Sequence, residues 1–140
     1  MDIIIIEDES FAARRLENMI AEIDGSICVK AKLESVSESV NWLNKNQLPD
    51  LIFLDIHLDD DLSFSIFKSI KVNCPIVFTT ATDEMATRGF ALLGIDYLLK
   101  PIVLTELKAI IEKYSDISNW NGQTINPEIF TDIINRNIKK

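Results

Sequence analysis

Five short apolar runs recur along the chain, and a polar residue follows most of them. The runs cover residues 2–6, 27–33, 51–54, 76–78 and 95–99. Short runs rich in β-branched and aromatic residues are typical of strands, and continuous apolar character predicts burial on both faces. The run at 27–33 alternates between apolar and polar residues towards its end. We therefore expect this run to be an edge strand with one partly exposed face.

Segments with helical periodicity separate these runs. Leu16, Met19, Ile20 and Ile23 follow one another at i, i+3, i+4 and i+7, which places them on one apolar helix face. We expect Ser10 to cap this first helix and Asp24-Gly25 to end it. The other predicted helices cover about residues 35–47, 63–72, 83–93 and 104–114.

Five strands that alternate with five helices predict an α/β fold with a parallel sheet and right-handed crossovers. Residues 1–115 are expected to form this domain. The polar segment 116–125 is rich in Asn, Ser and Gly and is predicted to be a linker. Asn126-Pro127 then indicates a helix start. The apolar stripe within 129–138 is more typical of a linker helix, or of a helix packed on its own domain, than of a partner-binding face.

Composition narrows the class of protein. The 140 residues include 14 basic and 22 acidic residues, which gives a net charge of −8. This balance argues against non-specific binding of nucleic acid or anionic membrane by the domain itself. The apolar run near the amino terminus is too short for a signal peptide or a membrane span, so we expect a cytoplasmic protein. Cys28 and Cys74 are expected to be buried, reduced thiols.

Polar residues whose side chains could bind ligands or react follow four of the predicted strands. They are Glu7 and Asp8, Asp55, Thr80, and Lys100. The carboxyl ends of parallel strands meet at one edge of a sheet, where ligands bind. Clustered carboxylates repel one another, and a hard divalent cation such as Mg²⁺ would compensate them. The arrangement suits phosphoryl transfer to Asp55, with Lys100 balancing charge and Thr80 donating a hydrogen bond.

Four motifs resemble the receiver domains of two-component response regulators. They are I-I-I-I-E-D-E at 3–9, L-I-F-L-D at 51–55, F-T-T-A at 78–81 and D-Y-L-L-K-P at 96–101. The resemblance covers about residues 1–115. It implies a flavodoxin-like, doubly wound sheet of five strands in the order 2-1-3-4-5. It also implies that Asp55 accepts phosphate from a phosphohistidine on a sensor histidine kinase. The chain would then catalyse only its own phosphorylation and dephosphorylation.

The resemblance assigns roles to individual residues. The implied Mg²⁺ ligands are Glu7, Asp8, Asp55 and the backbone carbonyl of His57. Thr80 and Tyr97 would form a switch pair that remodels the surface of helix four, strand five and helix five, where a homodimer could form. Lys100 would contact the phosphoryl group, and its bond to Pro101 would be cis. Residues 79–102 further resemble receivers joined to LytTR-type DNA-binding domains, which implies a transcriptional effector outside this sequence.

The loop after Asp55 departs from the family pattern. Asp59-Asp60-Asp61 stands where many receivers have Pro and Gly. The simplest interpretation is a solvated loop in which Asp tolerates turn geometry. A sharper hypothesis is that the run attracts the cation and repels phosphodonors. Thr82 also stands where close relatives often have an aromatic residue, and Glu7 replaces the more common Asp.

Other functions remain open on the sequence alone. The chain could be a phosphorylation-independent receiver that serves as a protein-interaction or dimerisation module. The acids and Lys100 could also form a structural salt-bridge cluster without chemistry. An aspartate-nucleophile phosphohydrolase needs a second acid two residues after its nucleophile, where this chain has His57. An FMN site is disfavoured because no Gly/Ser/Thr-rich phosphate loop follows the first strand.

Overall fold

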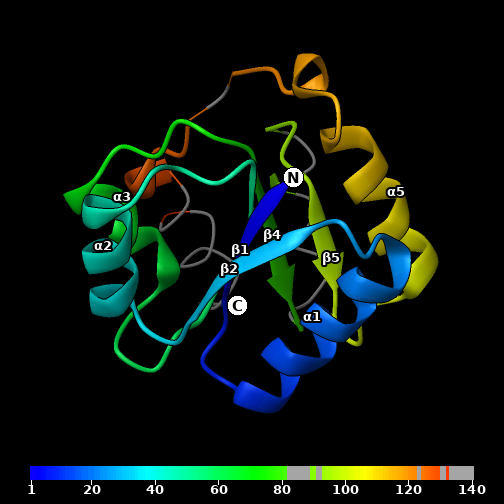
Figure 1. Ribbon diagram of the computed structural model, residues 1–140. Helices are drawn as coiled ribbons and strands as arrows, with labels where there is room; N and C mark the ends of the chain where they lie inside the picture. The colour runs from blue at the N-terminus through cyan, green and yellow to red at the C-terminus, as the bar shows by residue number, and fades with distance from the viewer. Residues whose placement is uncertain (82–88, 91–92, 123, 130–131, 133–140) are drawn as a thin grey trace.

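A single parallel sheet organises the protein (Figure 1). The computed structural model describes residues 1–81, 89–90, 93–122, 124–129 and 132. The strands are β1 (Asp2–Ile6), β2 (Cys28–Leu33), β3 (Leu51–Asp55), β4 (Ile76–Thr80) and β5 (Tyr97–Leu99). They pair in the order β2-β1-β3-β4-β5, and every pairing is parallel. The predicted fold, strand order and edge position of β2 are confirmed.

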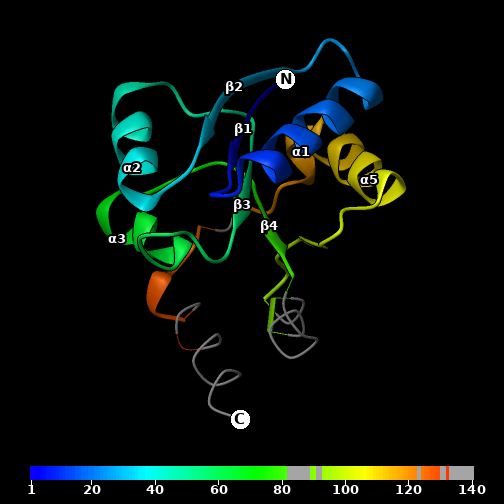
Figure 2. The same cartoon turned by 90° about the horizontal axis from the view of Figure 1, so that it is seen from below.

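Helices cover both faces of the sheet (Figure 2). They are α1 (Ser10–Ile23), α2 (Val36–Lys45), α3 (Ile66–Ser69) and α5 (Leu104–Tyr114), with short 3₁₀ helices η1 (Ser63–Ser65) and η2 (Ile117–Asn119). The helices α1 and α5 lie on one face, and α2 and α3 lie on the other. The helix predicted over about 83–93 lies mostly outside the described residues, although Gly89 and Phe90 are helical. None of the helices within the described ranges is long and apolar enough to cross a membrane.

Each central strand supplies side chains to two separate apolar clusters. Ile3 and Ile5 join the cluster beneath α1 and α5, whereas Ile4 and Ile6 join the cluster beneath α2 and α3. All four are at most 1% exposed. This two-sided burial explains why β1 reads as an uninterrupted apolar run rather than an alternating one. The central strands are therefore held rigidly at their carboxyl ends.

Several sequence predictions need correction. The cap of α1 is Glu9, whose carboxylate accepts hydrogen bonds from the amides of Phe11 and Ala12 at 3.1 and 2.8 Å. Cys28 is exposed, because outward-facing side chains of an edge strand meet solvent on the uncovered side. By contrast, Cys74 is buried as expected, and Ser35 caps α2 through the amide of Glu38.

Two element boundaries also differ from the sequence prediction. The third helix starts as η1 and ends at Ser69 rather than near Val72, since Ile70 is already extended. The fifth strand begins at Tyr97 rather than Ile95. Val72 and Ile95 are buried and Ile70 is partly buried, although none of them lies in a regular element, so apolar character alone overestimated both elements.

The segment after α5 packs against the domain. It crosses the edge of the sheet where the strands begin, from α5 towards α3 (Figure 1). Trp120 packs on the cluster beneath α1 and α5, and Ile125 packs on the opposite cluster. Residues 127–129 are helical, and the Asn126 side chain accepts hydrogen bonds from the amides of Glu128 and Ile129. The predicted helix start is thus confirmed, while most of the stripe to residue 138 lies outside the described residues.

The capping of α1 generates a stability prediction. Replacing Glu9 with Ala should lower the free energy of unfolding by about 1 kcal/mol, because two amides of the first turn lose their acceptor. Urea unfolding followed by circular dichroism measures this change. The neighbouring substitution Ser10→Ala is the matched control and should change the value by less than about 0.5 kcal/mol. A larger loss for Ser10→Ala than for Glu9→Ala would contradict this assignment of the cap.

Candidate functional site

Three carboxylates meet where β1 and β3 end. Glu7 and Asp8 directly follow β1, and Asp55 is the last residue of β3. The register pairs Ile6 with Leu54, so the next residues, Glu7 and Asp55, leave the sheet side by side. One oxygen from each of the three carboxylates lies within 4.8 Å of the others. The predicted acidic cluster therefore exists, with Glu7 and Asp55 buried and Asp8 half-buried.

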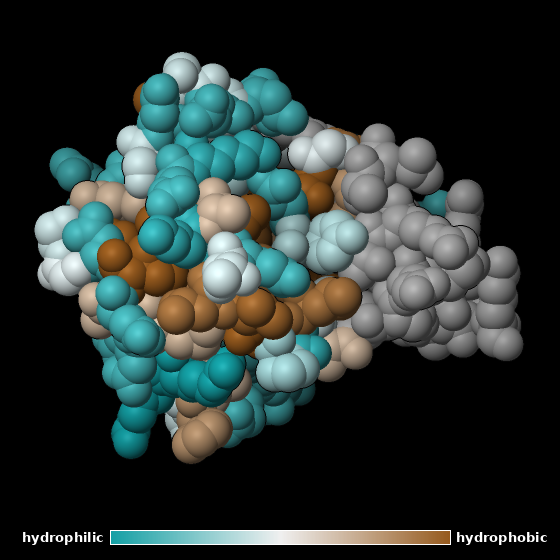
Figure 3. Space-filling view, turned by 90° about the vertical axis from the view of Figure 1, so that its right-hand side faces the viewer, coloured by the Kyte–Doolittle hydropathy of each residue, from teal (hydrophilic) through white to brown (hydrophobic). Residues whose placement is uncertain are grey.

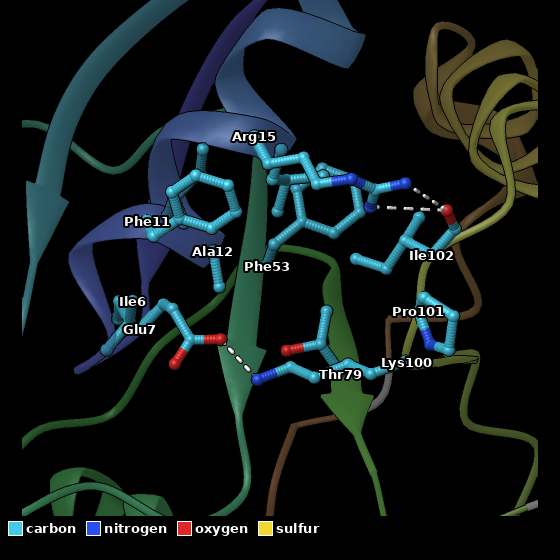
Figure 4. A pocket seen from close by; sticks show the side chains of 12 residues that line it. Ile6, Glu7, Phe11, Ala12, Arg15, Phe53, Thr79, Lys100, Pro101 and Ile102 are labelled. Atoms are coloured by element: carbon cyan, nitrogen blue, oxygen red, sulfur yellow. Dashed lines mark hydrogen bonds and ion pairs between the residues drawn. The ribbon is translucent and has the colours of Figure 1, made fainter.

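Lys100 reaches this cluster from the end of β5. Its ammonium forms ion pairs with Glu7 and with Asp55, the latter at 3.1 Å from Oδ2. Figure 4 shows the lysine side chain crossing beneath Thr79 towards Glu7. The backbone amide of Lys100 donates to the carbonyl of Thr80 at 2.8 Å, and the bond to Pro101 is cis, as the resemblance implied. The backbone thus fixes the base of this side chain.

The pKa values of this cluster show the competition between burial and pairing. Burial raises the pKa of Glu7, the hydrogen bond from Lys100 opposes that rise, and the neighbouring Asp55 adds to it. The net effect is that the pKa of Glu7 lies above its ordinary value. Burial lowers the pKa of Lys100, but the hydrogen bond to Glu7 and the charge of Asp55 outweigh it, so this pKa is also raised. The carboxylates carry more negative charge than the Lys100 ammonium balances.

The other predicted site residues surround this cluster. Thr80 is buried at the end of β4, the neighbour of β3. Tyr97 is half-buried at the start of β5, with its ring centroid 6.3 Å from that of Phe90. His57 is exposed in the loop after β3 and pairs with Leu62 in an isolated antiparallel bridge. These positions are compatible with the predicted roles but do not test them.

The aspartate run after β3 has three different environments. Asp59 lies close to Asp8, and this acidic neighbour raises the pKa of Asp59. Asp60 accepts hydrogen bonds from the amides of Val36 and Ser37. Asp61 accepts from the amide of Leu62 and the hydroxyl of Ser65. All three aspartates are exposed, as expected for a solvated loop, but Asp60 and Asp61 are also held by hydrogen bonds that the sequence prediction did not include.

The sequence contains a signal for the role of Asp61 but not for that of Asp60. An Asp directly before an apolar segment, as Asp61 stands before Leu62, is a local signal for a helix start. Asp60 gives no such signal, because its donors lie 24 and 23 residues earlier in the chain.

An apolar cavity, which no sequence pattern predicts, adjoins the acidic cluster. It has a volume of about 260 Å³ and lies between α1 and the segment that follows β5 (Figure 4). Its lining includes Phe53, Ile102 and the exposed side chain of Phe11, with the Glu7–Lys100 pair at one end. Among the lining residues, the guanidinium of Arg15 donates to the carbonyl of Ile102 at 3.4 Å. The Glu7–Lys100 pair therefore lies between the acidic cluster and an apolar hollow.

Comparisons with known proteins agree with this geometry. The family model described as the response regulator receiver domain matches residues 3–112. Sensory transduction protein LytT of Enterococcus faecalis is 33% identical over 118 residues, which cover 82% of this chain and 48% of that protein. Transcriptional regulatory protein LytR of Staphylococcus aureus strain N315 is 33% identical over 116 residues, which cover 81% of this chain and 46% of that protein. The chain spans about half the length of these curated relatives.

Solved structures agree as well. A two-component response regulator from Clostridium difficile superposes with a TM-score of 0.69 at 27% identity, covering 86% of this chain and 99% of that one. The response regulatory domain of protein mrkE from Klebsiella pneumoniae gives a TM-score of 0.69 at 28% identity, covering 84% of this chain and 97% of that one. A family model that spans most of the chain and solved relatives of the same fold lead to one conclusion: the chain belongs to the response regulator receiver domains.

Proposed function

We propose that this receiver accepts a phosphoryl group on Asp55 from a phosphohistidine of a sensor histidine kinase. The observation that carries the proposal is the Asp55 carboxylate itself, buried at the end of β3 and paired with Lys100 at 3.1 Å. In this step a bond forms between an Asp55 oxygen and phosphorus, and the bond from phosphorus to the histidine nitrogen breaks. The chain would catalyse only this transfer and the later hydrolysis of its own acyl phosphate.

Lys100 supplies positive charge where the reaction needs it. Its ammonium already contacts Asp55 and can shift onto a phosphoryl oxygen once Asp55 carries the phosphoryl group. Because Glu7 holds the same ammonium, Lys100 stays at the site while its partner changes. Thr80 is proposed to donate its hydroxyl to another phosphoryl oxygen. The burial of these groups strengthens each of these interactions relative to water.

The residues at the site fit a magnesium ion. Glu7, Asp8 and Asp55 offer carboxylate oxygens within 4.8 Å of one another, and their charge exceeds that of Lys100. Oxygen donors of this kind, completed by water and phosphate, are what Mg²⁺ prefers. We propose that the backbone carbonyl of His57 completes the protein ligands. When bound, the ion would neutralise charge on the phosphoryl oxygens.

The signal is proposed to leave through β5 and α5. Tyr97 would turn inward as Thr80 moves towards the phosphoryl group. The residue before Tyr97, Asp96, accepts hydrogen bonds from Lys113 at 2.8 Å and from Tyr114, so β5 is tied to the end of α5. A change at Tyr97 would therefore reach α5 directly.

An apolar surface on this side supports a homodimer. Seen from the side of α5, a band of apolar residues crosses the molecule (Figure 3). On β5 and at the start of α5, the exposed apolar side chains are Leu99, Val103 and Leu104. We propose that phosphorylation favours pairing of two copies through helix four, β5 and α5.

The output is proposed to be transcription. The LytR relative of Staphylococcus aureus is named a transcriptional regulatory protein and is about twice as long as the matched segment. A DNA-binding effector of the LytTR type would then act with this receiver, while the receiver itself, with a charge of −8, would not contact nucleic acid. The location would be the cytoplasm, which suits the exposed free thiol of Cys28.

The central prediction concerns labelling of Asp55. Incubation with acetyl phosphate and Mg²⁺ should add one phosphoryl group to the wild-type chain, as measured by intact-mass spectrometry. Asp55→Asn should show no gain, because the nucleophilic carboxylate is absent. Asp116→Asn is the matched control: this exposed aspartate only caps η2, and the variant should label like the wild type. An unlabelled wild type would overturn the proposed function and favour a phosphorylation-independent receiver.

A second prediction follows from the raised pKa of Glu7. A carboxyl whose folded pKa lies above its ordinary value of 4.5 stabilises the fold below that value, and this stabilisation is lost as pH rises through the folded pKa. Because glutamine does not ionise, the Glu7→Gln variant should not lose this stability as the pH rises. Without divalent cations, its urea midpoint should match that of the wild type near pH 4 and exceed it at pH 7.

The control for this prediction is Glu22→Gln, which makes the same charge change on the exposed surface of α1. Its midpoint should follow the wild-type midpoint across the pH range. A Glu7→Gln midpoint equal to or below the wild-type value at pH 7 would show that the Lys100 pair outweighs burial and repulsion. Added Mg²⁺ should narrow the gap, because only the wild type keeps all three carboxylates.

A further inference from the structure

The loop after Asp55 is a tight hairpin with two aspartates at its tip. Its two arms are joined by two backbone hydrogen bonds, which together form the antiparallel His57–Leu62 bridge. They run from the Ser63 amide to the Ile56 carbonyl at 2.9 Å and from the Leu58 amide to the Asp61 carbonyl at 3.1 Å. Asp59 and Asp60 therefore form the turn. Ile56 and Leu58 are buried, so the base of the hairpin is anchored in the core while its tip is exposed.

The two tip residues contact different neighbours. Asp59 lies against Asp8, one of the carboxylates of the acidic cluster. Asp60 lies against the amino terminus of α2. The tip is thus held between the loop that follows β1 and the first turn of α2.

The contact of Asp60 with α2 is a well-formed helix cap. Its Oδ1 accepts from the amide of Val36 at 2.9 Å, and its Oδ2 accepts from the amide of Ser37 at 3.2 Å. These are the first two residues of α2, whose amides have no acceptor within the helix. The hydroxyl of Ser35 caps the next available amide, that of Glu38. A carboxylate at this end is also favoured by the helix dipole, and the amide of Val36 lowers the pKa of Asp60.

The contact of Asp59 with Asp8 is unfavourable by itself. Two carboxylates that approach one another repel, and an exposed hairpin tip is free to move away. The anchored Asp60 next to Asp59 opposes that movement. Without it, repulsion would carry the tip, and Asp59 with it, away from the acidic cluster.

We propose that Asp60 is a positioning residue for the cation site, whose carboxylate clamps the hairpin tip to α2 and so keeps the loop against the acidic cluster. This inference rests on the proposed function of that cluster. Asp60 would act through the hairpin, whose tip carries Asp59 next to Asp8 and whose base carries the proposed ligand His57. Partners that orient metal ligands in this indirect way typically change metal affinity by about 10–100-fold when they are removed.

The donor side of the clamp can be removed without changing any charge. Val36→Pro deletes the amide that binds Asp60 Oδ1, at the first helical position, where proline is well tolerated. The preceding Ser35 already has φ −144° and ψ 166°, the extended conformation that a following proline requires. Val36→Ala is the matched control, because it shortens the same side chain and keeps the amide.

The test measures Mg²⁺ binding to the 140-residue chain by isothermal titration calorimetry. Asp60→Ala and Val36→Pro should each raise the dissociation constant for Mg²⁺ about tenfold, whereas Val36→Ala should bind like the wild type. The double variant Asp60→Ala/Val36→Pro should bind no more weakly than Asp60→Ala, since both changes remove one contact. At saturating Mg²⁺, the rate of labelling by acetyl phosphate should return to the wild-type rate in both single variants, which a general loss of structure would not allow.

Different failures have different meanings. A wild-type dissociation constant for folded Val36→Pro would overturn the clamp, even if Asp60→Ala bound weakly, because the lost charge alone would then explain the latter. Absence of Mg²⁺ binding by the wild type would instead overturn the proposed function. Hydrogen exchange gives a test that does not need the proline variant: the amides of Leu58 and Ser63 should exchange faster in Asp60→Ala. Unchanged protection of both would also overturn the clamp.

Discussion

Repulsion among Glu7, Asp8 and Asp55 is the constraint on which the rest of the site depends. Three acidic groups within 4.8 Å of one another tend to separate, and two of them are buried. They stay together because β1 and β3 are neighbouring strands that end at the same level of one rigid sheet. Lys100 compensates part of the charge from the end of β5. The negative charge that Lys100 does not balance favours binding of a further positive group at this site.

The apolar core supplies the energy that keeps this arrangement in place. Each isoleucine of β1 is almost completely buried, and full burial of such a side chain contributes roughly 1.5–3 kcal/mol. Four such residues in succession, packed alternately into two clusters, outweigh the repulsion at the end of the strand. The raised pKa of Glu7 reflects the burial and the repulsion that remain. The hairpin after Asp55 adds a second repulsion, between Asp59 and Asp8, which Asp60 offsets by binding α2.

The strand ends could be predicted from the sequence because the signal is local. A short apolar run that is followed by Asp55 or Lys100 predicts both the strand and the end of the strand at which the polar side chain lies. The features that escaped prediction depend on partners far along the chain or on fine geometry. Asp60 binds amides of a distant helix, and the exposure of Cys28 depends on what covers β2. Glu9 rather than Ser10 caps α1 because the helix begins at Ser10, one residue earlier than a Ser10 cap would place it.

The claim at the centre of this account is that Asp55 forms an acyl phosphate beside Lys100. Reduction with borohydride tests it most directly, because this reagent converts an aspartyl phosphate to homoserine and leaves a free carboxylate unchanged. After treatment with acetyl phosphate and Mg²⁺, peptide sequencing by mass spectrometry should find homoserine at position 55. Homoserine at another aspartate, such as Asp59, or at none, would contradict the account.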